Sequence, residues 1–296
     1  MDNPPELDGR VAVVTGGTRG VGAGIVRAFL RAGAEVVVCA RRPPNAPVEV
    51  AGRKAEFVPV NLRDGDAVRA FFARVATDYG RLDALVNNAG GTPYRPLSAA
   101  DANRHARVLE LNLTAPLIAS LAAYEVMTTR QGPEGAGPEG AGGSITMIGS
   151  VSGSRPSPGT AAYGAAKAGL EHLARSMAVE WAPAVRVNTL VLGMVRTELS
   201  HLHYGDEEGV AAVGRTVPLG RLAEPEEIGE AAVFLASDRA AYISGASLLV
   251  HGGGERPAFL DAANADRTDG ADRNGGADRN GRADRNGRNG ETDREK

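Results

Sequence analysis

Tyr163 and Lys167 are the residues of this sequence whose types and spacing most directly suggest chemistry. They lie four positions apart in an alanine-rich stretch, so a helix would place both side chains on one face. A phenol, with a pKa of about 10, is a poor proton donor or acceptor at neutral pH, but a neighbouring ammonium stabilises its phenolate. The chain has three lysines and uses arginine for nearly every other cation. The pair therefore predicts a tyrosine that acts as a general acid or base.

A glycine-rich turn near the N-terminus reads Thr15-Gly16-Gly17-Thr18-Arg19-Gly20-Val21-Gly22. Glycines at 16, 20 and 22 allow a tight turn and let backbone N–H groups approach a pyrophosphate. The positive end of a following helix dipole adds to this attraction. Such turns are common, but an apolar run before it and a helical pattern after it favour nucleotide binding over a plain turn.

Short apolar runs alternate with longer helical stretches along most of the chain. Most of these runs are apolar throughout, which is typical of strands buried on both faces. The order predicts one Rossmann-type α/β domain, a doubly wound parallel sheet of about seven strands with helices on both faces. The predicted strands are Val11–Thr15, Glu35–Ala40, Glu56–Val60, Leu82–Asn87, Ser144–Gly149, Val185–Leu190 and Ala246–Val250, and the predicted helices include Val21–Ala32, Asp66–Tyr79 and Ala161–Trp181.

Two segments fall outside this pattern. Gly132–Gly143 contains the sequence GPEGA twice, which predicts a surface loop away from the ligand crevice. From Ala265 onward a six-residue unit built around Ala-Asp-Arg recurs, and it carries almost no apolar side chain beyond alanine. Such repeats bury nothing when stacked, so we expect a catalytic domain over residues 1–260 and a disordered low-complexity tail over 261–296.

Several spaced motifs, in this order, resemble those of the short-chain dehydrogenase/reductase family, from about Leu7 to Gly253. The resemblance implies an enzyme that interconverts a ketone and a secondary alcohol by hydride transfer to or from a nicotinamide cofactor. The motifs are the glycine spacing G-x-x-x-G-x-G, Asn87-Asn88-Ala89-Gly90, Asn112, Ser150, Tyr163-x-x-x-Lys167 and the turn at Gly193.

The resemblance also implies catalytic roles for four residues. Tyr163 would exchange a proton with the substrate oxygen, and Lys167 would support it and bind the nicotinamide ribose. Ser150 would hold and polarise the carbonyl. Asn112 would lie on a kinked helix and hold a water that relays protons through Lys167; a satisfied buried amide is the alternative.

The residues that would bind the cofactor follow from the same resemblance. The backbone of Val195 would bind the carboxamide and Thr197 would lie near the phosphates, although Leu192 stands where the family usually has proline. The full set is Gly16, Thr18, Arg19, Gly20, Val21, Arg41, Asn61, Leu62, Asn88, Ala89, Gly90, Tyr163, Lys167, Gly193, Val195 and Thr197.

The second predicted strand indicates which dinucleotide is bound. NAD-preferring enzymes carry an acid at its end to bind the ribose 2′-hydroxyl. Here Ala40 fills that place, Arg41 follows it, and Arg19 lies in the glycine turn. Two guanidiniums suit a 2′-phosphate, so we expect NADP(H) rather than NAD(H). Two solvated surface arginines are the alternative.

Composition limits the partners. A formal net charge of −3 gives no sign of a nucleic-acid or membrane-surface partner. The one cysteine, Cys39, cannot form an internal disulfide and lies in an apolar run, so it is expected to be a small buried hydrophobe. The N-terminal residues lack a secretory pattern, and no run approaches the ~18 apolar residues of a membrane span. The expected location is the cytoplasm.

The region Glu198–Thr216 should form a lid over the substrate. It contains His201-Leu202-His203, but residues two apart lie on different faces of a helix, so no metal site is predicted. These residues would shape the substrate pocket together with Tyr94 and Arg95, and Arg95 favours an acidic or thioester-carrying substrate. A 3-oxoacyl-thioester reductase acting on acyl-carrier-protein or CoA esters, a hydroxysteroid-type dehydrogenase and a polyketide ketoreductase remain open, as does a non-catalytic NADP(H)-binding regulatory protein.

The expected partners are a small carbonyl or alcohol substrate and further copies of the chain. By resemblance, Asn103–Arg130 and Ala161–Trp181 form helix contacts between subunits, and Ala246–Gly253 forms a second contact. A homotetramer or a homodimer is therefore expected.

Overall fold

A computed structural model describes residues 5–129, 142–255 and 257–259. Nearly all of the predicted loop Gly132–Gly143 and the whole predicted tail 261–296 lie outside the described residues.

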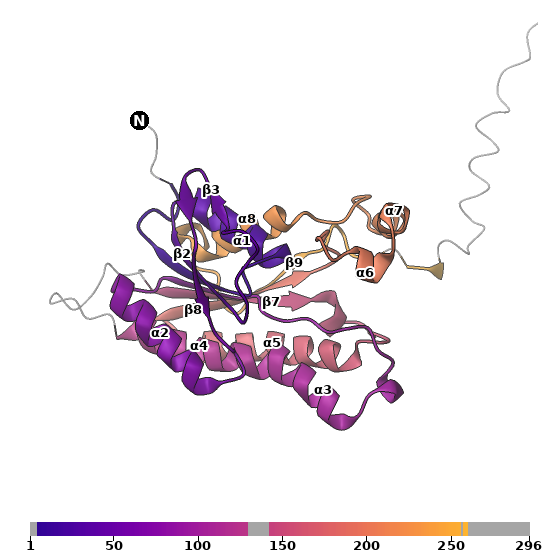
Figure 1. Ribbon diagram of the computed structural model, residues 1–296, viewed down its shortest axis with the longest axis horizontal. Coiled ribbons are helices and arrows are strands. Elements are labelled where there is room, and N and C mark those ends of the chain that lie inside the picture. The colour runs from indigo at the N-terminus through magenta and orange to yellow at the C-terminus, as the bar shows by residue number, and fades with distance from the viewer. Residues whose placement is uncertain (1–4, 130–141, 256, 260–296) are drawn as a thin grey trace, which may run out of the picture. The chain divides into compact units, whose positions relative to one another are not determined.

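Seven parallel strands form one sheet, in the order β5-β2-β1-β6-β7-β8-β9 (Figure 1). The chain builds outward from β1 in one direction and then returns to build outward in the other, which is the predicted doubly wound topology. All seven predicted strands are confirmed, each end within two residues. They are β1 (Val11–Thr15), β2 (Glu35–Ala40), β5 (Glu56–Pro59), β6 (Ala84–Asn87), β7 (Gly143–Ser150), β8 (Val185–Leu192) and β9 (Ser247–Val250).

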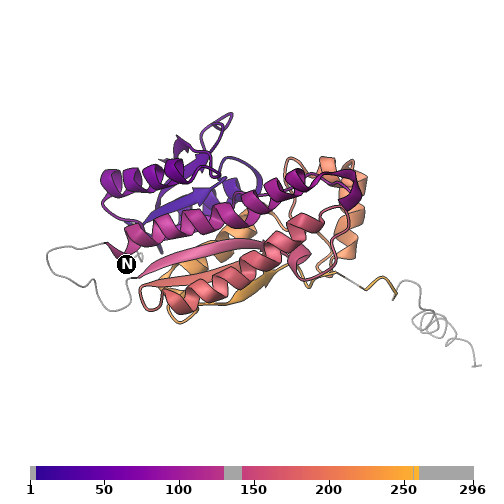
Figure 2. The same ribbon diagram turned by 90° about the horizontal axis from the view of Figure 1, so that it is seen from below.

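Helices cover both faces of the sheet (Figures 1 and 2). On one face α1 (Gly20–Arg31) packs against α8 (Pro225–Ala236), and on the other lie α2 (Gly65–Tyr79), α4 (Ala115–Thr128) and α5 (Ala161–Glu180). Each face has its own apolar core, and this is why the central strands are apolar at every position rather than at alternate ones.

The crossover from β2 to β5 contains a feature that was not predicted. In place of a helix it forms a short antiparallel hairpin of β3 (Glu49–Val50) and β4 (Arg53–Lys54). The preceding segment contains Pro43, Pro44 and Pro47, which lack an N–H donor and disfavour a helix.

The predicted helix Asn103–Arg130 is present as α3 (Ala102–Leu109), a π-helical turn (Glu110–Thr114) and α4. Taken together, Ala102–Thr128 is long and apolar enough to cross a membrane, since an 18-residue window within it has a mean hydropathy of 1.2. This is weak evidence for a span, because a helix that packs in a soluble core meets the same criteria. Ala119 and Ala123 of α4 pack in the core against the sheet.

The remaining helices are short. α6 (His201–Tyr204) and α7 (Glu207–Thr216) lie in the predicted lid region. Within the described ranges, 3-10 turns cover Leu97–Ala99, Val151–Gly153 and Asp238–Ala240.

Candidate active site

Ser150 and Tyr163 lie at the two ends of a loop that folds back onto α5. Ser150 ends β7, and a 3-10 turn follows directly, with the N–H of Ser152 donating to Ser150 Oγ at 3.2 Å. Glycines allow the turn to approach α5 closely: a Cβ on Gly164 would lie 2.6 Å from the carbonyl oxygen of Ser152. The loop thereby brings the Ser150 hydroxyl into hydrogen-bonding contact with Tyr163.

Lys167 lies one turn further along α5 and is 4% exposed. Its Nζ donates to the carbonyl oxygen of Ile148 at 2.7 Å and lies 5.5 Å from the centre of the Tyr163 ring. Burial lowers the pKa of Lys167 to about 8. Burial also raises the pKa of Tyr163, and the hydrogen bond with Ser150 opposes this change.

Asn112 is fully buried in the π-helical turn. Its Oδ1 accepts from the N–H of Gly91 at 2.8 Å, and its Nδ2 donates to the carbonyl oxygens of Gly91 at 3.0 Å and Val108 at 2.9 Å. A Cβ on Gly90 would lie 2.6 Å from Asn112 Oδ1 and 3.6 Å from Lys167 Nζ. Both polar atoms therefore lie beside the same glycine.

The glycine turn forms a cradle at the start of α1. Gly16 and Gly20 have φ angles of 65° and 53°, and a Cβ on Gly22 would lie 2.3 Å from the carbonyl oxygen of Gly16. No side chain caps the N-terminus of α1, and its first turn holds no acidic residue. Its first N–H groups and its positive dipole end are thus available to an anion.

Asn88 braces this turn. Its Nδ2 donates to the carbonyl oxygens of Thr15 at 2.9 Å and Gly16 at 3.1 Å. In return, Thr15 Oγ1 accepts from the N–H groups of Asn88 and Ala89, both at 3.0 Å. The Asn88 side chain therefore holds the shape of the turn. A ligand at this segment would contact its backbone.

Arg19 and Arg41 lie on neighbouring segments, because Arg19 precedes α1 and Arg41 follows β2, which pairs with β1. Both are exposed, and neither forms an ion pair within the described part of the chain. Further along the same edge, Leu62 is buried, and Asn61 Oδ1 accepts from the N–H of Arg63 at 3.3 Å.

The segment after β8 lies beside Ala223. The N–H of Ala223 donates to Met194 at 3.0 Å, and the N–H of Arg196 donates to Ala223 at 2.8 Å. Because successive residues of an extended chain point their N–H and C=O groups to opposite sides, those of Val195 face away from Ala223. Thr197 lies beside the turn, with its Cγ2 3.4 Å from where a Cβ on Gly20 would be.

Two further positions shape this turn. A Cβ on Gly193 would lie 2.7 Å from His251 Cβ, so only glycine fits there. Leu192, which stands where the family usually has proline, continues β8 and pairs with Ser150 and Val250.

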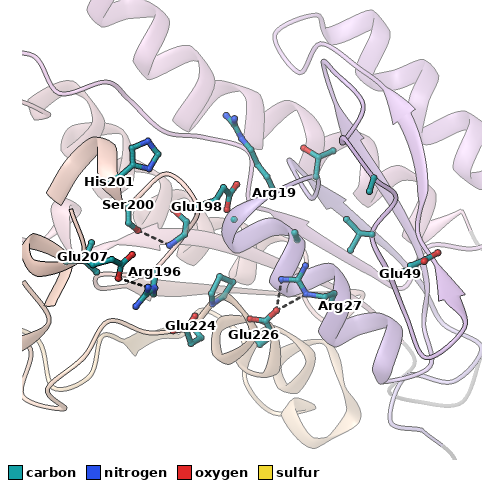
Figure 3. Close-up of a pocket in the computed structure, with 18 of the residues that line it drawn as sticks. Arg19, Arg27, Glu49, Arg196, Glu198, Ser200, His201, Glu207, Glu224 and Glu226 are labelled. Atoms are coloured by element: carbon teal, nitrogen blue, oxygen red, sulfur yellow. Dashed lines mark hydrogen bonds and ion pairs between the residues drawn. The ribbon is translucent and has the colours of Figure 1, made fainter. Parts of the chain in front are cut away.

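A cavity of about 880 Å³ lies beside the glycine turn (Figure 3). Its lining includes Thr18, Gly20 and Thr197 together with two ion pairs, Arg27–Glu226 at 2.5 Å and Arg196–Glu207 at 2.7 Å. Tyr163 and Lys167 do not line it. The cavity therefore belongs to the glycine turn and not to the Tyr163–Lys167 pair.

The structure brings forward one pair of residues that sequence reasoning missed. Arg155 Nη2 lies 2.5 Å from Glu255 Oε1, across 100 residues of sequence. The sequence shows that Arg155 stands between Ser150 and Tyr163, but no sequence pattern indicates that it pairs with Glu255. Arg95, the cation expected to shape the substrate pocket, is exposed and donates from Nη1 to the carbonyl oxygen of Ala99 at 3.4 Å.

His201 and His203 of α6 are exposed. Within the described ranges, no group of three or more His, Cys, Asp or Glu side chains is close enough together to hold a metal ion.

Comparison with known proteins gives concordant results. A family model described as "Enoyl-(Acyl carrier protein) reductase" matches residues 16–255. The chain is 36% identical over 250 residues to the cis-4-hydroxycyclohexanecarboxylate dehydrogenase of Sinomonas cyclohexanicum, covering 82% of this chain and 96% of that protein. It is 35% identical over 251 residues to the 3-oxoacyl-(acyl-carrier-protein) reductase FabG of Vibrio cholerae, covering 83% and 98%.

A solved structure supports the same relationship. The ligand-free aldohexose dehydrogenase of Thermoplasma acidophilum superposes with a TM-score of 0.75 at 27% identity, covering 85% of this chain and 96% of that one.

Proposed function

The chain belongs to the short-chain dehydrogenase/reductase family of oxidoreductases that act on CH–OH groups, and we propose that it interconverts a ketone and a secondary alcohol with NADP(H) and Tyr163 as the general acid or base. The observation that carries this proposal is that two groups lie beside the phenol of Tyr163. They are the hydroxyl of Ser150, at the end of β7, and the ammonium of Lys167, on the same face of α5 as Tyr163.

The residues present fit a dinucleotide. The uncapped start of α1 and the close approach of Gly22 to Gly16 form a cradle that a side chain would fill. The N–H and C=O of Val195 are free of the Ala223 bridge and suit a carboxamide. When bound, the nicotinamide supplies or accepts the hydride.

The proton steps fall to this chain's own side chains. In the reductive direction Ser150 Oγ donates a hydrogen bond to the carbonyl oxygen, and the Tyr163 hydroxyl gives its proton to the same oxygen. In the oxidative direction Tyr163 takes the proton back. Because burial raises the Tyr163 pKa, a positive charge nearby is needed to support the phenolate, and Lys167 supplies one.

The ammonium of Lys167 can donate further hydrogen bonds. An ammonium has three N–H donors, and one of them is used by Ile148. The other two can bind ribose hydroxyls and a water. This water would lie between Lys167 and Asn112, since Nζ and Oδ1 both lie beside Gly90.

The preference for NADP(H) rests on Arg19 and Arg41. Both lie at the edge where the adenine ribose would bind, and neither is paired with an acid within the described residues. Most other arginines near the site, such as Arg27 and Arg196, are already paired. Unpaired guanidiniums at this edge suit a 2′-phosphate.

The test is oxidation of NADPH, and separately of NADH, over a panel of ketoacyl thioesters, steroids and cyclic ketones. Tyr163→Phe should lower kcat by about 100-fold or more on any substrate found, because general acid–base catalysis contributes about that much. Tyr242→Phe, at a fully exposed position, is the matched control. Unchanged turnover in Tyr163→Phe would defeat the catalytic role. Binding of NADPH without reduction of any ketone would leave a non-catalytic NADP(H)-binding regulatory protein as the better interpretation, and failure to bind NADPH would contradict the cofactor assignment.

A narrower candidate is the reduction of 3-oxoacyl thioesters. The family model that matches carries an acyl-carrier-protein reductase description, and the Vibrio relative acts in that class by its name. Turnover of acetoacetyl thioesters well above that of cyclic ketones and steroids would favour it.

We also propose a cytoplasmic homotetramer. Leu121 of α4 and Val179 of α5 are 47% and 81% exposed on the helices expected to pair, and Leu249 of β9 is 57% exposed. Exposed apolar side chains on these elements are consistent with contacts between subunits. Sedimentation velocity of the full chain would distinguish a tetramer from a dimer or a monomer.

A further inference from the structure

Three segments that are distant in sequence meet beyond the catalytic residues. They are the loop after Ser150, the segment after β9 and the end of α6. Arg155 of the first is bonded to Glu255 of the second at 2.5 Å, and Tyr204 of the third lies in the electrostatic field of both. Burial is the main cause that raises the pKa of Tyr204, and the charges of Arg155 and Glu255 act on it in opposite directions.

The position of Arg155 is tied to the reacting groups. Its N–H donates to Val151 at 3.2 Å, which extends the 3-10 turn that begins at Ser150. That turn is seated on α5, because a Cβ on Gly153 would lie 2.8 Å from the backbone nitrogen of Ala168. Arg155 is thus carried by the short, packed segment that also positions Ser150.

The ion pair itself can be opened. The side chains of Arg155 and Glu255 are 40% and 36% exposed, and ion pairs exposed to this degree contribute little to stability. One nitrogen, Nη1, is held by the carbonyl oxygen of Pro156 at 3.1 Å, while Nη2 faces Glu255. The guanidinium is therefore fixed at one side and presents its other side to a carboxylate.

We infer that Arg155 binds a carboxylate carried by the substrate, and that Glu255 occupies this position in the free enzyme. The substrate class is then a keto acid and the corresponding hydroxy acid, with the carbonyl at Ser150 and Tyr163 and the carboxylate at Arg155. A guanidinium fork matches the two oxygens of a carboxylate, which an ester or an amide does not reproduce. This inference rests on the proposed function, since it assigns a substrate to the same site.

The first experiment compares substrates that differ only in charge. The pairs are 4-oxocyclohexanecarboxylate with its methyl ester and levulinate with its methyl ester, and the readout is the acid-to-ester ratio of kcat/KM. The wild-type ratio should exceed tenfold for at least one pair, and Arg155→Met should bring it close to one. Glu255→Gln should lower KM for the acid several-fold, because the competing carboxylate is removed.

Arg74→Met is the matched control, because Arg74 is also an ion-paired arginine and lies on α2 away from these segments. It should leave the ratio as in the wild type. A ratio that does not change in Arg155→Met, while ketones are still reduced, would overturn the inference and leave the proposed function standing.

A second experiment does not depend on turnover. Isothermal titration of the full-length protein, with and without NADP⁺, would measure the binding of cyclohexanecarboxylate and of cyclohexanecarboxamide. The carboxylate should bind at least tenfold more tightly than the amide in the wild type and not in Arg155→Met. Arginine-dependent binding without reduction of any ketone would support the anion site and defeat the proposed function. Equal binding of the two ligands would overturn the inference.

Discussion

The ammonium nitrogen of Lys167 lies 5.5 Å from the centre of the Tyr163 ring and 2.7 Å from the carbonyl oxygen of Ile148. A backbone carbonyl of β7 thus holds the ammonium of the lysine, while α5 places the lysine beside the tyrosine. Burial works against both charged forms, since it lowers the Lys167 pKa and raises the Tyr163 pKa. A buried site that disfavours a single charge favours two opposite charges side by side. The phenolate of Tyr163 beside the ammonium of Lys167 would be such a pair.

The stability of the protein should depend on pH through Lys167. Its folded-state pKa of about 8 is below its ordinary value of 10.5, so the unfolded chain binds the proton more tightly between these values. The penalty for burying the charge is fully present below pH 8 and is relieved as pH rises towards 10.5. Its upper bound is about 3 kcal/mol. The Tm of Lys167→Met minus that of the wild type should therefore decrease from pH 7 to pH 10. A difference that is constant with pH would contradict the burial effect.

A methyl group at Gly22 should abolish the nucleotide cradle. A Cβ there would lie 2.3 Å from the Gly16 carbonyl oxygen, so Gly22→Ala must displace the turn. Overpacking of this kind costs about 1–3 kcal/mol. We expect a lower Tm and at least tenfold weaker NADPH binding by fluorescence titration. Gly65→Ala, at an uncrowded position at the start of α2, is the control and should change neither quantity.

Removal of either unpaired arginine should weaken NADPH selectively. A hydrogen bond to a charged group contributes about 1.5–3 kcal/mol, so Arg19→Ala and Arg41→Ala should each raise the KM for NADPH about tenfold or more. The KM for NADH should change much less, because NADH lacks the 2′-phosphate. Arg42→Ala removes the adjacent exposed arginine and serves as the control. A wild-type enzyme that prefers NADH would contradict the assignment of these residues.

The start of α8 should be sensitive to acid. Glu227 accepts from the N–H of Glu224 at 2.8 Å and forms a two-pronged contact with Arg221, and the Arg221 hydrogen bond is the main cause that lowers its pKa to about 2. Because the folded-state pKa is below the unfolded value, the carboxylate stabilises the protein above pH ~4.3 and loses this effect as pH falls towards 2.

Glu227→Ala should lower the free energy of unfolding by about 1 kcal/mol at pH 7, a modest value because the exposed contact is screened by solvent. The difference should shrink at pH 3. Urea titration at both values is the measurement, with Glu230→Ala on the same helix as the control. An equal loss at both values would exclude ionisation of Glu227 as the cause.

Local sequence patterns determined the seven strands, the main helices and the spacing of Tyr163 and Lys167. Strands buried on both faces must be apolar throughout, and residues four apart share a helix face whatever the surroundings. The glycines at 16, 20 and 22 likewise predicted the tight turn, because only glycine tolerates such turns and close contacts. These properties depend on near neighbours in the chain, and the sequence contains them completely.

Only the tertiary structure decided which distant side chains meet. The hairpin β3–β4 in the crossover from β2 to β5 was not predicted, because its two-residue strands are too short to show a period-two pattern in the sequence. The hydrogen bonds of Asn112 go to Gly91 as well as to its own helix, which no local pattern indicates. Arg155 and Glu255 are 100 residues apart and are adjacent only because their segments follow neighbouring parts of one sheet edge. Such contacts arise from the summed packing of the whole domain, so their partners could not be predicted from spacing alone.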